Sequence, residues 1–519
     1  MKKYFITMIL VSFSMTTTAN AQLTPQAAAQ ALGRGINIGN TFDAPSETAW
    51  GNPALTASNF DDYKNAGFTS VRIPITWDTH TSGTTPYSIN KTFLDRIDTV
   101  VSWGLKRGLM IIINTHHESW IKDDSAYANP SKRARFDSIW SQIATRFQNR
   151  SDSLLFEIIN EPTISATDTL SAANVNDLNA KALSVIRQTN PHRIVLFSGN
   201  HWSNSAELLA AAIPQDNYLI GYYHSYDPYP FGLLGTGTFG SMGDISAIAQ
   251  KFNQVASWSS QHTVPAVLSE YGAIDTSDYN SRMCYYATVA QKALFYNVPF
   301  MAWEDGGDFK FYDRTQHTWT EVKDVIIHTY KESPNFLVIS FNGASSVTLQ
   351  WRNNTADDSG IVVERKVNNG NFADFAQLAS TATSFNDSTA TAGNSYYYRL
   401  RTNVKDSIIV ESYPMMITIP NSTSSVVQTA APLQYQLYNN YPNPFNPTTT
   451  IAFEIPQRSH VTLKIYNVLG KEIATIFSGE LASGMHKQQW NAAGVSSGVY
   501  FYRLTAGSFI SVKKMVLLK

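Results

Sequence analysis

Eight short apolar runs alternate with longer amphipathic stretches between Gly35 and Ile327, and this alternation limits the possible folds more than any other feature of the sequence. Several runs, such as residues 109–113, are apolar at every position instead of every second one. This pattern is typical of parallel strands that are buried on both faces. The predicted strands are residues 35–41, 70–77, 109–117, 154–162, 193–201, 218–226, 265–272 and 299–304.

Helical periodicity fills the intervals between these strands. Phe93, Ile97, Val100 and Val101, for example, fall at i, i+4, i+7 and i+8, so they share one face of a helix. A β–α unit that repeats eight times predicts an α/β fold, the (β/α)8 TIM barrel. A doubly wound parallel sheet is the alternative, but the glycine-rich phosphate loop expected after its first strand is absent from the sequence.

The hydrophobic pattern changes after Pro334. Residues 334–419 alternate apolar and polar positions without a helical stretch, which predicts a small β-sandwich. Trp351 on an early strand and the tyrosines at 396–398 on a late strand make this domain resemble a fibronectin type III module. Residues 420–432 are predicted to form a flexible linker, and residues 433–519 a second small all-β sandwich.

The N-terminus has the order of a secretory signal peptide. Lys2 and Lys3 precede an apolar run over residues 4–15, and small residues at 19–21 follow at the spacing of a cleavage site. A membrane anchor needs about 18 or more apolar residues, and no stretch of the sequence reaches that length. We therefore predict a signal peptide over residues 1–21, an exported protein without a transmembrane segment, and a barrel domain over residues 22–333.

Charge and cysteine content exclude some classes of protein. The 39 basic and 40 acidic residues nearly balance, so there is no basic surface charge to attract nucleic acid. Aromatic residues make up 12% of the chain, which mildly favours a carbohydrate ligand because flat rings stack on the apolar faces of sugars. Cys284 is the only cysteine, so no disulfide can form within the chain. Its apolar-periodic surroundings predict a packed position on a helix.

Polar side chains stand at the ends of nearly all the predicted strands. In a TIM barrel these C-terminal strand ends meet at one rim, where functional groups gather. Polar groups are costly to bury, and chance would scatter them. The residues are Arg72 on the second strand, His116, His117 and Glu118 at the third, Asn160 and Glu161 at the fourth, His224 and Tyr226 at the sixth, Glu270 at the seventh, and Trp303 and Glu304 at the eighth.

Two of these carboxylates, Glu161 and Glu270, form the pair that cleavage of a glycosidic bond requires. One carboxyl protonates the leaving oxygen, and the other stays ionised to attack the anomeric carbon or to activate water. Other interpretations remain for single residues, since a glutamate at a strand end can form a rim salt bridge and Asn160 can cap a helix. His116 and His117 could bind a metal, but no histidine lies four residues beyond His117, so the zinc-protease motif is absent.

Five sequence blocks together resemble glycoside hydrolase family 5. They are residues 35–41 (GINIGNT), 47–53 (ETAWGNP), 71–74 (VRIP), 114–118 (NTHHE) and 160–162 (NEP). The early blocks are most similar to the endoglucanase and xyloglucanase group, subfamily 4. The resemblance covers roughly residues 28–330 and implies a secreted, retaining endo-β-1,4-glucanase that needs no metal and no cofactor.

The resemblance also implies a role for each residue at the rim. Glu161 matches the acid/base and Glu270 the nucleophile. Ser269 departs mildly from the small residue that many relatives carry before the nucleophile. Trp120, Trp202 and Tyr229 are further candidates for sugar stacking, with ordinary packing as the alternative. The expected substrate-binding residues are Arg72 and Tyr226, which hydrogen-bond the nucleophile, Asn160 at the sugar 2-hydroxyl, His116 and His224 beside the reaction centre, Trp303 under the −1 sugar, and His117 and Trp50.

The C-terminal domain resembles a type IX secretion sorting domain. The blocks that carry this resemblance are residues 441–447, 465–470, 497–500 and 514–519. It implies that the type IX secretion machinery is a partner and that the protein is secreted or displayed at the cell surface. The alternative, a carbohydrate-binding module, would need a face of exposed aromatic residues. The middle sandwich is predicted to be a spacer, with sugar binding as its alternative.

Alternatives for the function remain open. The same mechanism could act on xyloglucan, xylan or mannan, because specificity depends on loops beyond the −1 site. A catalytically dead protein that binds polysaccharide is the alternative outside enzymes, but such a protein would be expected to lose at least one carboxylate. We expect a monomer whose partner is a β-1,4-linked polysaccharide, and we expect no nucleic-acid ligand.

Overall fold

The structure is a computed structural model of the 519-residue chain. The predicted signal peptide, residues 1–21, lies outside the residues that the structure describes, and so do residues 421–432 of the predicted linker. The described residues are 22–341, 346–354, 360–404, 408–420, 435–438, 440, 443–455, 458–481, 484–507 and 509–518.

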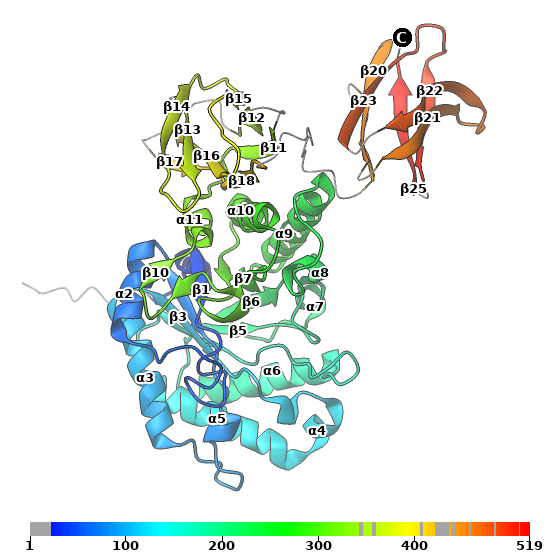
Figure 1. Cartoon of the computed structure of the whole chain (residues 1–519). Helices are drawn as coiled ribbons and strands as arrows, with labels where there is room; N and C mark the ends of the chain where they lie inside the picture. The colour runs from blue at the N-terminus through cyan, green and yellow to red at the C-terminus, as the bar shows by residue number, and fades with distance from the viewer. Residues whose placement is uncertain are drawn as a thin grey trace, which may run out of the picture.

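Eight parallel strands form a closed barrel in chain order, which confirms the predicted TIM barrel (Figure 1). The last strand pairs with the first, where Gly35 lies opposite Met301. Several strands end earlier than the sequence predicts; β2, for example, was expected to reach residue 77 and ends at Ile73. The strands are β1 Arg34–Asn37, β2 Ser70–Ile73, β3 Met110–Asn114, β4 Leu154–Glu157, β5 Val195–Phe197, β6 Leu219–His224, β7 Ala266–Tyr271 and β8 Phe300–Ala302.

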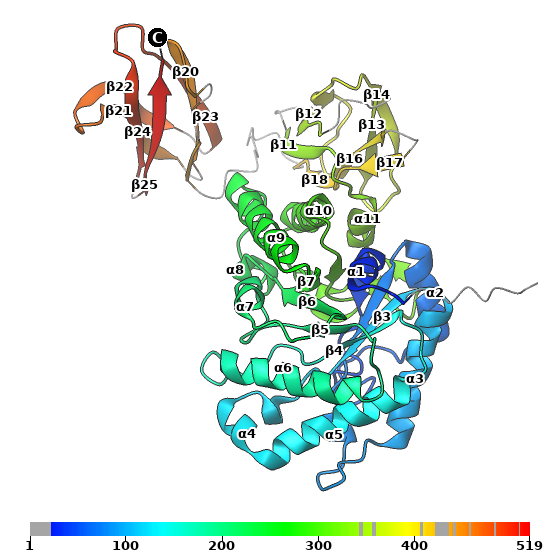
Figure 2. The same ribbon diagram turned by 180° about the vertical axis from the view of Figure 1, so that it is seen from behind.

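Helices surround the barrel (Figures 1 and 2). The predicted stripe on α3 is confirmed, because Ile97, Val100 and Val101 are buried, while the Asn90 side chain accepts from the Phe93 N–H and caps the helix. The helices are α1 Pro25–Leu32, α2 Ala57–Ala66, α3 Lys91–Lys106, α4 Asp124–Ala128, α5 Pro130–Phe147, α6 Ala172–Arg187, α7 Ser205–Ala210, α8 Tyr229–Gly232, α9 Met242–His262, α10 Tyr279–Tyr296 and α11 Glu321–His328. Short elements in the loops are η1 Asp78–His80, η2 Ser119–Ile121, η3 Gly307–Phe309, β9 Tyr312–Asp313 and β10 Thr318–Trp319.

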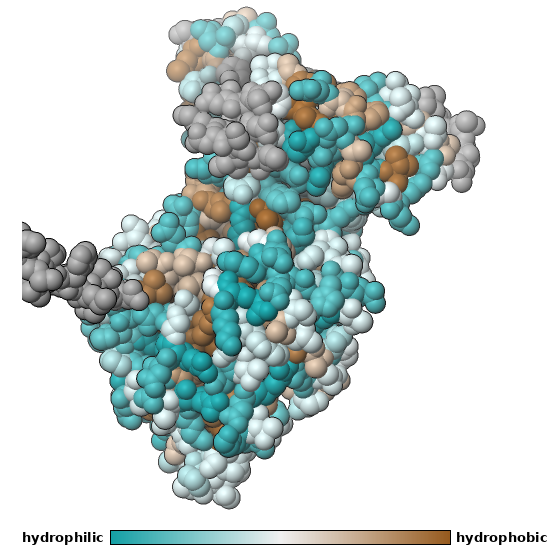
Figure 3. Space-filling view, turned by 90° about the vertical axis from the view of Figure 1, so that its left-hand side faces the viewer, coloured by the Kyte–Doolittle hydropathy of each residue, from teal (hydrophilic) through white to brown (hydrophobic). Residues whose placement is uncertain are grey.

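The barrel interior is filled by apolar side chains that α1 covers. Ala28 and Leu32 of α1 pack in one buried cluster with barrel residues such as Ile112, Leu196 and Met301. This packing closes one end of the barrel, which leaves the polar rim at the other end for function. The outer face of the barrel in Figure 3 is mostly hydrophilic, with apolar residues scattered over it.

A β-sandwich follows the barrel, as the alternating pattern predicts. Trp351, Val363 and Tyr398 are buried in its core. Its resemblance to a fibronectin type III module stays a prediction. One sheet contains β11 Asn335–Phe341, β12 Val347–Arg352 and β15 Ser384–Asp387; the other contains β14 Ala373–Leu378, β13 Ile361–Val367, β16 Ser395–Val404, β17 Ile408–Glu411 and β18 Met415–Thr418.

The sandwich packs directly on the barrel through α10 and α11. The Asn280 side chain on α10 donates to the Met416 carbonyl at 2.9 Å and accepts from its N–H at 2.7 Å. Lys366 of the sandwich pairs with Glu321 of α11. Because α10 is covered on both sides, most of its residues are buried, including Cys284, whose predicted helical packing is confirmed.

The C-terminal domain is a separate all-β unit with its own apolar core. Trp490 is buried in that core, so it cannot serve as an exposed sugar-stacking residue. Among the residues that the structure describes, no helix is both long and apolar enough to span a membrane. The two sheets of this unit contain β19 Gln436–Leu437, β20 Thr448–Ile455 and β23 Gly484–Asn491, and β22 Glu472–Leu481, β21 Ser459–Asn467, β24 Gly498–Ala506 and β25 Phe509–Leu517.

Candidate active site

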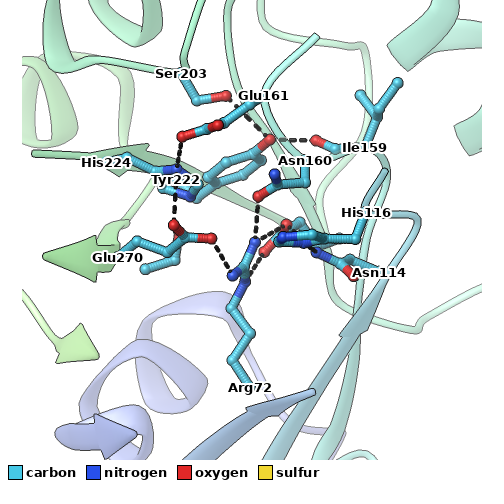
Figure 4. A network of polar contacts seen from close by, with 12 residues as sticks. Arg72, Asn114, His116, Ile159, Asn160, Glu161, Ser203, Tyr222, His224 and Glu270 are labelled. Carbon is cyan, nitrogen blue, oxygen red and sulfur yellow. Dashed lines mark hydrogen bonds and ion pairs between the residues drawn. The ribbon is translucent and has the colours of Figure 1, made fainter. Parts of the chain in front are cut away.

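One connected polar network lies at the C-terminal ends of the barrel strands (Figure 4). Arg72 on β2 is at its centre and is fully buried. It contacts side chains from three other strands or their following loops, namely Asn37, Asn160 and Glu270. The rim residues that the sequence predicts to cluster are therefore brought together, and a buried arginine joins them.

Glu270 on β7 accepts hydrogen bonds at both carboxylate oxygens. Arg72 Nη1 donates to Oε1 at 2.5 Å, and the Tyr226 hydroxyl donates to Oε2 at 2.9 Å. His224 Nδ1 lies 3.5 Å from Oε2. Burial raises the pKa of the Glu270 carboxyl, while the charges of His224 and Arg72 oppose that rise. The donors around Glu270 therefore favour an ionised carboxylate that would otherwise be costly to bury.

Glu161 follows β4 and faces Glu270 across His224 (Figure 4). His224 Nδ1 lies 2.8 Å from Glu161 Oε1, and one ligand atom from each of the three residues lies within 4.8 Å of the other two. Glu161 has a φ of 36°, a left-handed conformation that a glutamate adopts only when its surroundings hold it there. The Glu161 side chain is 25% exposed against 6% for Glu270, so Glu161 is the carboxylate that solvent can reach.

The pKa of Glu161 is controlled by its neighbour His224. Burial alone would raise it, but the hydrogen bond from His224, with the charges of His224, Lys122 and Arg72, lowers it below its ordinary value. The hydrogen bond from His224 and the nearby positive charges therefore favour the ionised form of Glu161.

His116 and Trp303 pack face to face. Their rings are nearly parallel, with centroids 5.9 Å apart and an interplanar angle of 3°. Burial, with the charges of His117 and Arg72, lowers the pKa of His116 well below its ordinary value. A neutral His116 can hydrogen-bond a sugar hydroxyl without adding charge.

Three of the predicted sugar-stacking residues are exposed aromatic side chains. Trp50 is 48% exposed and its ring packs edge-on against His117 at 5.9 Å. Trp202 and Tyr229 are also exposed, so both can stack on a sugar. Trp120 is different, because its N–H donates to Glu118 at 2.6 Å and Arg135 covers its ring. We therefore regard Trp120 as rim packing.

Three buried polar residues of the network escape sequence reasoning. Asn37, Asn114 and Glu157 are each the last residue of a barrel strand, and Glu157 forms a bidentate pair with Arg72. A signal for Glu157 is present, since it is a lone acidic residue at the end of the apolar run Leu154–Phe156. Glu304 takes no part in this network; it accepts from Asn40, and burial beside Asp305 raises its pKa well above the ordinary value.

Two groups of described side chains have the composition of a metal site, and some of their atoms already form hydrogen bonds within the protein. In the group of Glu161, His224 and Glu270, Arg72 and Tyr226 already donate to Glu270. In the group of Asp43, His116 and His117, the Asp43 carboxylate accepts from two backbone N–H groups, and His116 Nδ1 faces an amide of Asn114. Part of each group's ligand atoms therefore already has hydrogen-bond partners within the protein.

Comparisons with known proteins agree with this geometry. Residues 34–306 match the family model described as cellulase (glycosyl hydrolase family 5). Similar curated proteins include endoglucanase H of Acetivibrio thermocellus, 40% identical over 57% of this chain and 33% of that protein, and endoglucanase A of Clostridium longisporum, 32% identical over 58% and 65%. The chain thus spans about a third of the length of the first of these relatives.

Solved structures share the barrel. The endoglucanase Cel5A from Thermotoga maritima is 31% identical, with a TM-score of 0.55, and the match covers 59% of this chain and all of that one. A tri-modular endo-β-1,4-glucanase from Bacillus licheniformis matches 95% of this chain with a TM-score of 0.63; at 22% identity it shows the fold alone.

The C-terminal unit has a match of its own. Residues 439–518 match the family model of a secretion system C-terminal sorting domain. This unit is therefore a sorting domain, and it directs the chain to the cell surface or to the exterior.

Proposed function

Because the chain belongs to the cellulase family, glycosyl hydrolase family 5, we propose that it is a secreted, retaining endo-β-1,4-glucanase that hydrolyses plant cell-wall β-glucans. The observation that carries this proposal is the spacing of Glu161 and Glu270, whose nearest oxygens lie within 4.8 Å of each other at the barrel rim. Retaining enzymes hold their two carboxyl groups roughly 5–5.5 Å apart, whereas inverting enzymes leave a wider gap for a water molecule.

In the first step a Glu270 oxygen attacks the anomeric carbon of the sugar in the −1 site. Glu161 gives its proton to the glycosidic oxygen as the bond to the leaving chain breaks. The products of this step are a glycosyl ester on Glu270 and a shortened polysaccharide with a new hydroxyl. Arg72 and Tyr226 donate to Glu270 and favour its ionised form before the attack. We assign Asn160, which accepts from Arg72, to the sugar 2-hydroxyl.

In the second step Glu161, now ionised, removes a proton from water. The resulting oxygen attacks the anomeric carbon from the side that the leaving group vacated, and Glu270 is released as a carboxylate. Two inversions at one carbon give net retention. The hydrogen bond between His224 and Glu161 stabilises the ionised form that this step needs.

The substrate alternatives are xyloglucan, xylan and mannan. Mannan has a specific observation in its favour, because the similar Cel5A of Thermotoga maritima was solved in complex with mannotriose as well as cellobiose. The exposed rings of Trp50, Trp202 and Tyr229 suit any β-linked chain with flat apolar faces. We further propose the type IX secretion machinery as a partner, through the sorting domain.

The test is reducing-sugar release by the full exported chain from a cellulose derivative, mixed-linkage glucan, xyloglucan, xylan and mannan. We expect the fastest release from the β-1,4-linked glucans. Faster release from mannan or xylan would reassign the substrate and keep the mechanism. Binding to these polysaccharides without release from any of them would support the non-catalytic binding protein and contradict the proposal.

A further inference from the structure

Glu157 is a fully buried carboxylate beneath the site that the proposed mechanism does not use. Its two oxygens accept from Arg72 Nε at 2.7 Å and Arg72 Nη2 at 2.6 Å. The oxygen that faces Nη2 also accepts from Asn114 Nδ2 at 2.9 Å. Because Glu157 is fully buried, it acts on a substrate only through other residues.

The bidentate contact fixes the plane of the Arg72 guanidinium. A guanidinium is planar with its N–H groups in a rigid fork, so two bonds on one edge determine where the remaining donors point. Here the remaining donors of Arg72 reach Glu270 and Asn160. Glu157 therefore sets the position of the proposed nucleophile and of the proposed 2-hydroxyl contact together.

A second arm of the network, by which we mean a chain of hydrogen bonds, runs from Glu157 through Asn114 to His116. Asn114 Oδ1 accepts from the Ile75 N–H at 3.0 Å and Nδ2 donates to Glu157, which fixes the orientation of the Asn114 amide. The same Nδ2 faces His116 Nδ1 at 3.1 Å, so Nδ1 must be the acceptor. Because His116 is neutral, its proton then sits on Nε2.

We propose that Glu157 is a positioning residue for the site. It holds Arg72 against Glu270 and Asn160, and it fixes the tautomer of His116 through Asn114. The inference rests on the proposed function for the roles of Glu270 and Asn160. The tautomer of His116 follows from contacts alone and is independent of any reaction.

The negative charge of Glu157 distinguishes a positioning role from simple packing, because only the positioning role affects the ionisation of Glu270. Burial alone would lower the pKa of Arg72, but the charges of Glu157 and Glu270 raise it, so Arg72 stays protonated between two carboxylates. Without the negative charge of Glu157, the charge of Arg72 acts on Glu270 alone. The ionised form of Glu270 is then favoured, its pKa falls, and the acidic limb of the pH profile moves to lower pH.

The kinetic test compares Glu157→Gln and Glu157→Asp with the unaltered full chain, using the pH dependence of kcat/KM on an aryl cellobioside. We expect Glu157→Gln to lower kcat/KM by about 100-fold through misplaced contacts and to move the acidic limb down by about one pH unit. Glu157→Asp keeps the charge, so its limb stays near that of the unaltered enzyme even though its kcat/KM falls.

Asp216→Asn is the matched control, because Asp216 forms a bidentate pair with Arg187 away from the site. It should leave the acidic limb unmoved. A folded Glu157→Gln enzyme with an unmoved limb, or equal limb shifts in the Gln and Asp variants, would overturn the positioning role. If Glu157→Gln does not fold, Asn114→Ala carries the test, and an unchanged kcat/KM in that variant would overturn the His116 arm.

A second readout needs no activity. The 15N chemical shifts of the His116 ring, assigned by comparison with His116→Gln, should show a proton on Nε2 in the unaltered chain and a mixture of tautomers in Glu157→Gln. A proton on Nδ1 in the unaltered chain would refute the proposed arm through Asn114. If the chain hydrolyses no substrate but shows the Nε2 tautomer, the proposed function fails while this part of the inference stands.

Discussion

Glu270→Ala should abolish hydrolysis of every polysaccharide that the unaltered enzyme cleaves. The variant has no atom that can form the glycosyl ester, and Arg72 loses one of its two carboxylate partners. Loss of a nucleophile commonly lowers kcat on the order of 10⁴-fold or more. The measurement is the initial rate of reducing-sugar release at saturating substrate, with the melting temperature of the variant checked alongside.

Added azide should restore cleavage of an aryl cellobioside by Glu270→Ala, because a small anion can enter the space left by the carboxylate. Attack by azide from that side gives a product of inverted configuration. Glu207→Ala, a change at a partly exposed glutamate of α7, is the control and should keep the rate of the unaltered enzyme. Retention of more than a tenth of the rate by Glu270→Ala would exclude Glu270 as the nucleophile.

Glu161→Gln should separate substrates by their leaving groups. Without the acid, cleavage of an unactivated glycosidic bond should slow by about 10³-fold, within the usual range for general acid–base catalysis. A dinitrophenyl leaving group needs no proton, so the first step should remain fast with that substrate. The second step lacks its base, so we expect a burst of dinitrophenol equal to the enzyme concentration, followed by slow turnover.

Stopped-flow absorbance at two or more enzyme concentrations measures this burst. Asn160→Ala is a useful contrast, because loss of a substrate contact should slow both classes of substrate without a burst of this kind. Equal losses of rate for the dinitrophenyl and the unactivated substrate in Glu161→Gln would contradict the assignment of Glu161 as acid/base.

The barrel and most of its rim were predictable from the sequence for a physical reason. Strands buried on both faces are mostly apolar, so the polar residues that gather near their C-terminal ends, such as His116, Asn160 and Glu270, mark where the strands end. In a closed parallel barrel all these ends meet at one rim. The same reasoning made several predicted strands too long. Most rim residues belong to the loops and not to the hydrogen-bonded strands, as after β3 and β4.

The buried polar residues that hold the rim residues in place were not predictable. Asn37, Asn114 and Glu157 end strands that are otherwise apolar, and each forms its key contact with a residue on another strand. A single sequence does not give those side-chain contacts. The same holds for the covering of α10 by the sandwich, where the Asn280 contact with Met416 joins positions far apart in the chain.

The most direct test of the central claim is to trap the glycosyl-enzyme. A cellobioside with fluorine at C2 and a dinitrophenyl leaving group destabilises both oxocarbenium-like transition states, and the good leaving group keeps the first step accessible, so the ester accumulates. Mass spectrometry of the full chain should show one added fluorocellobiosyl group, and peptide mapping should place it on Glu270. A label on another residue, or no label together with α-configured first products from an active enzyme, would contradict the retaining mechanism proposed for Glu161 and Glu270.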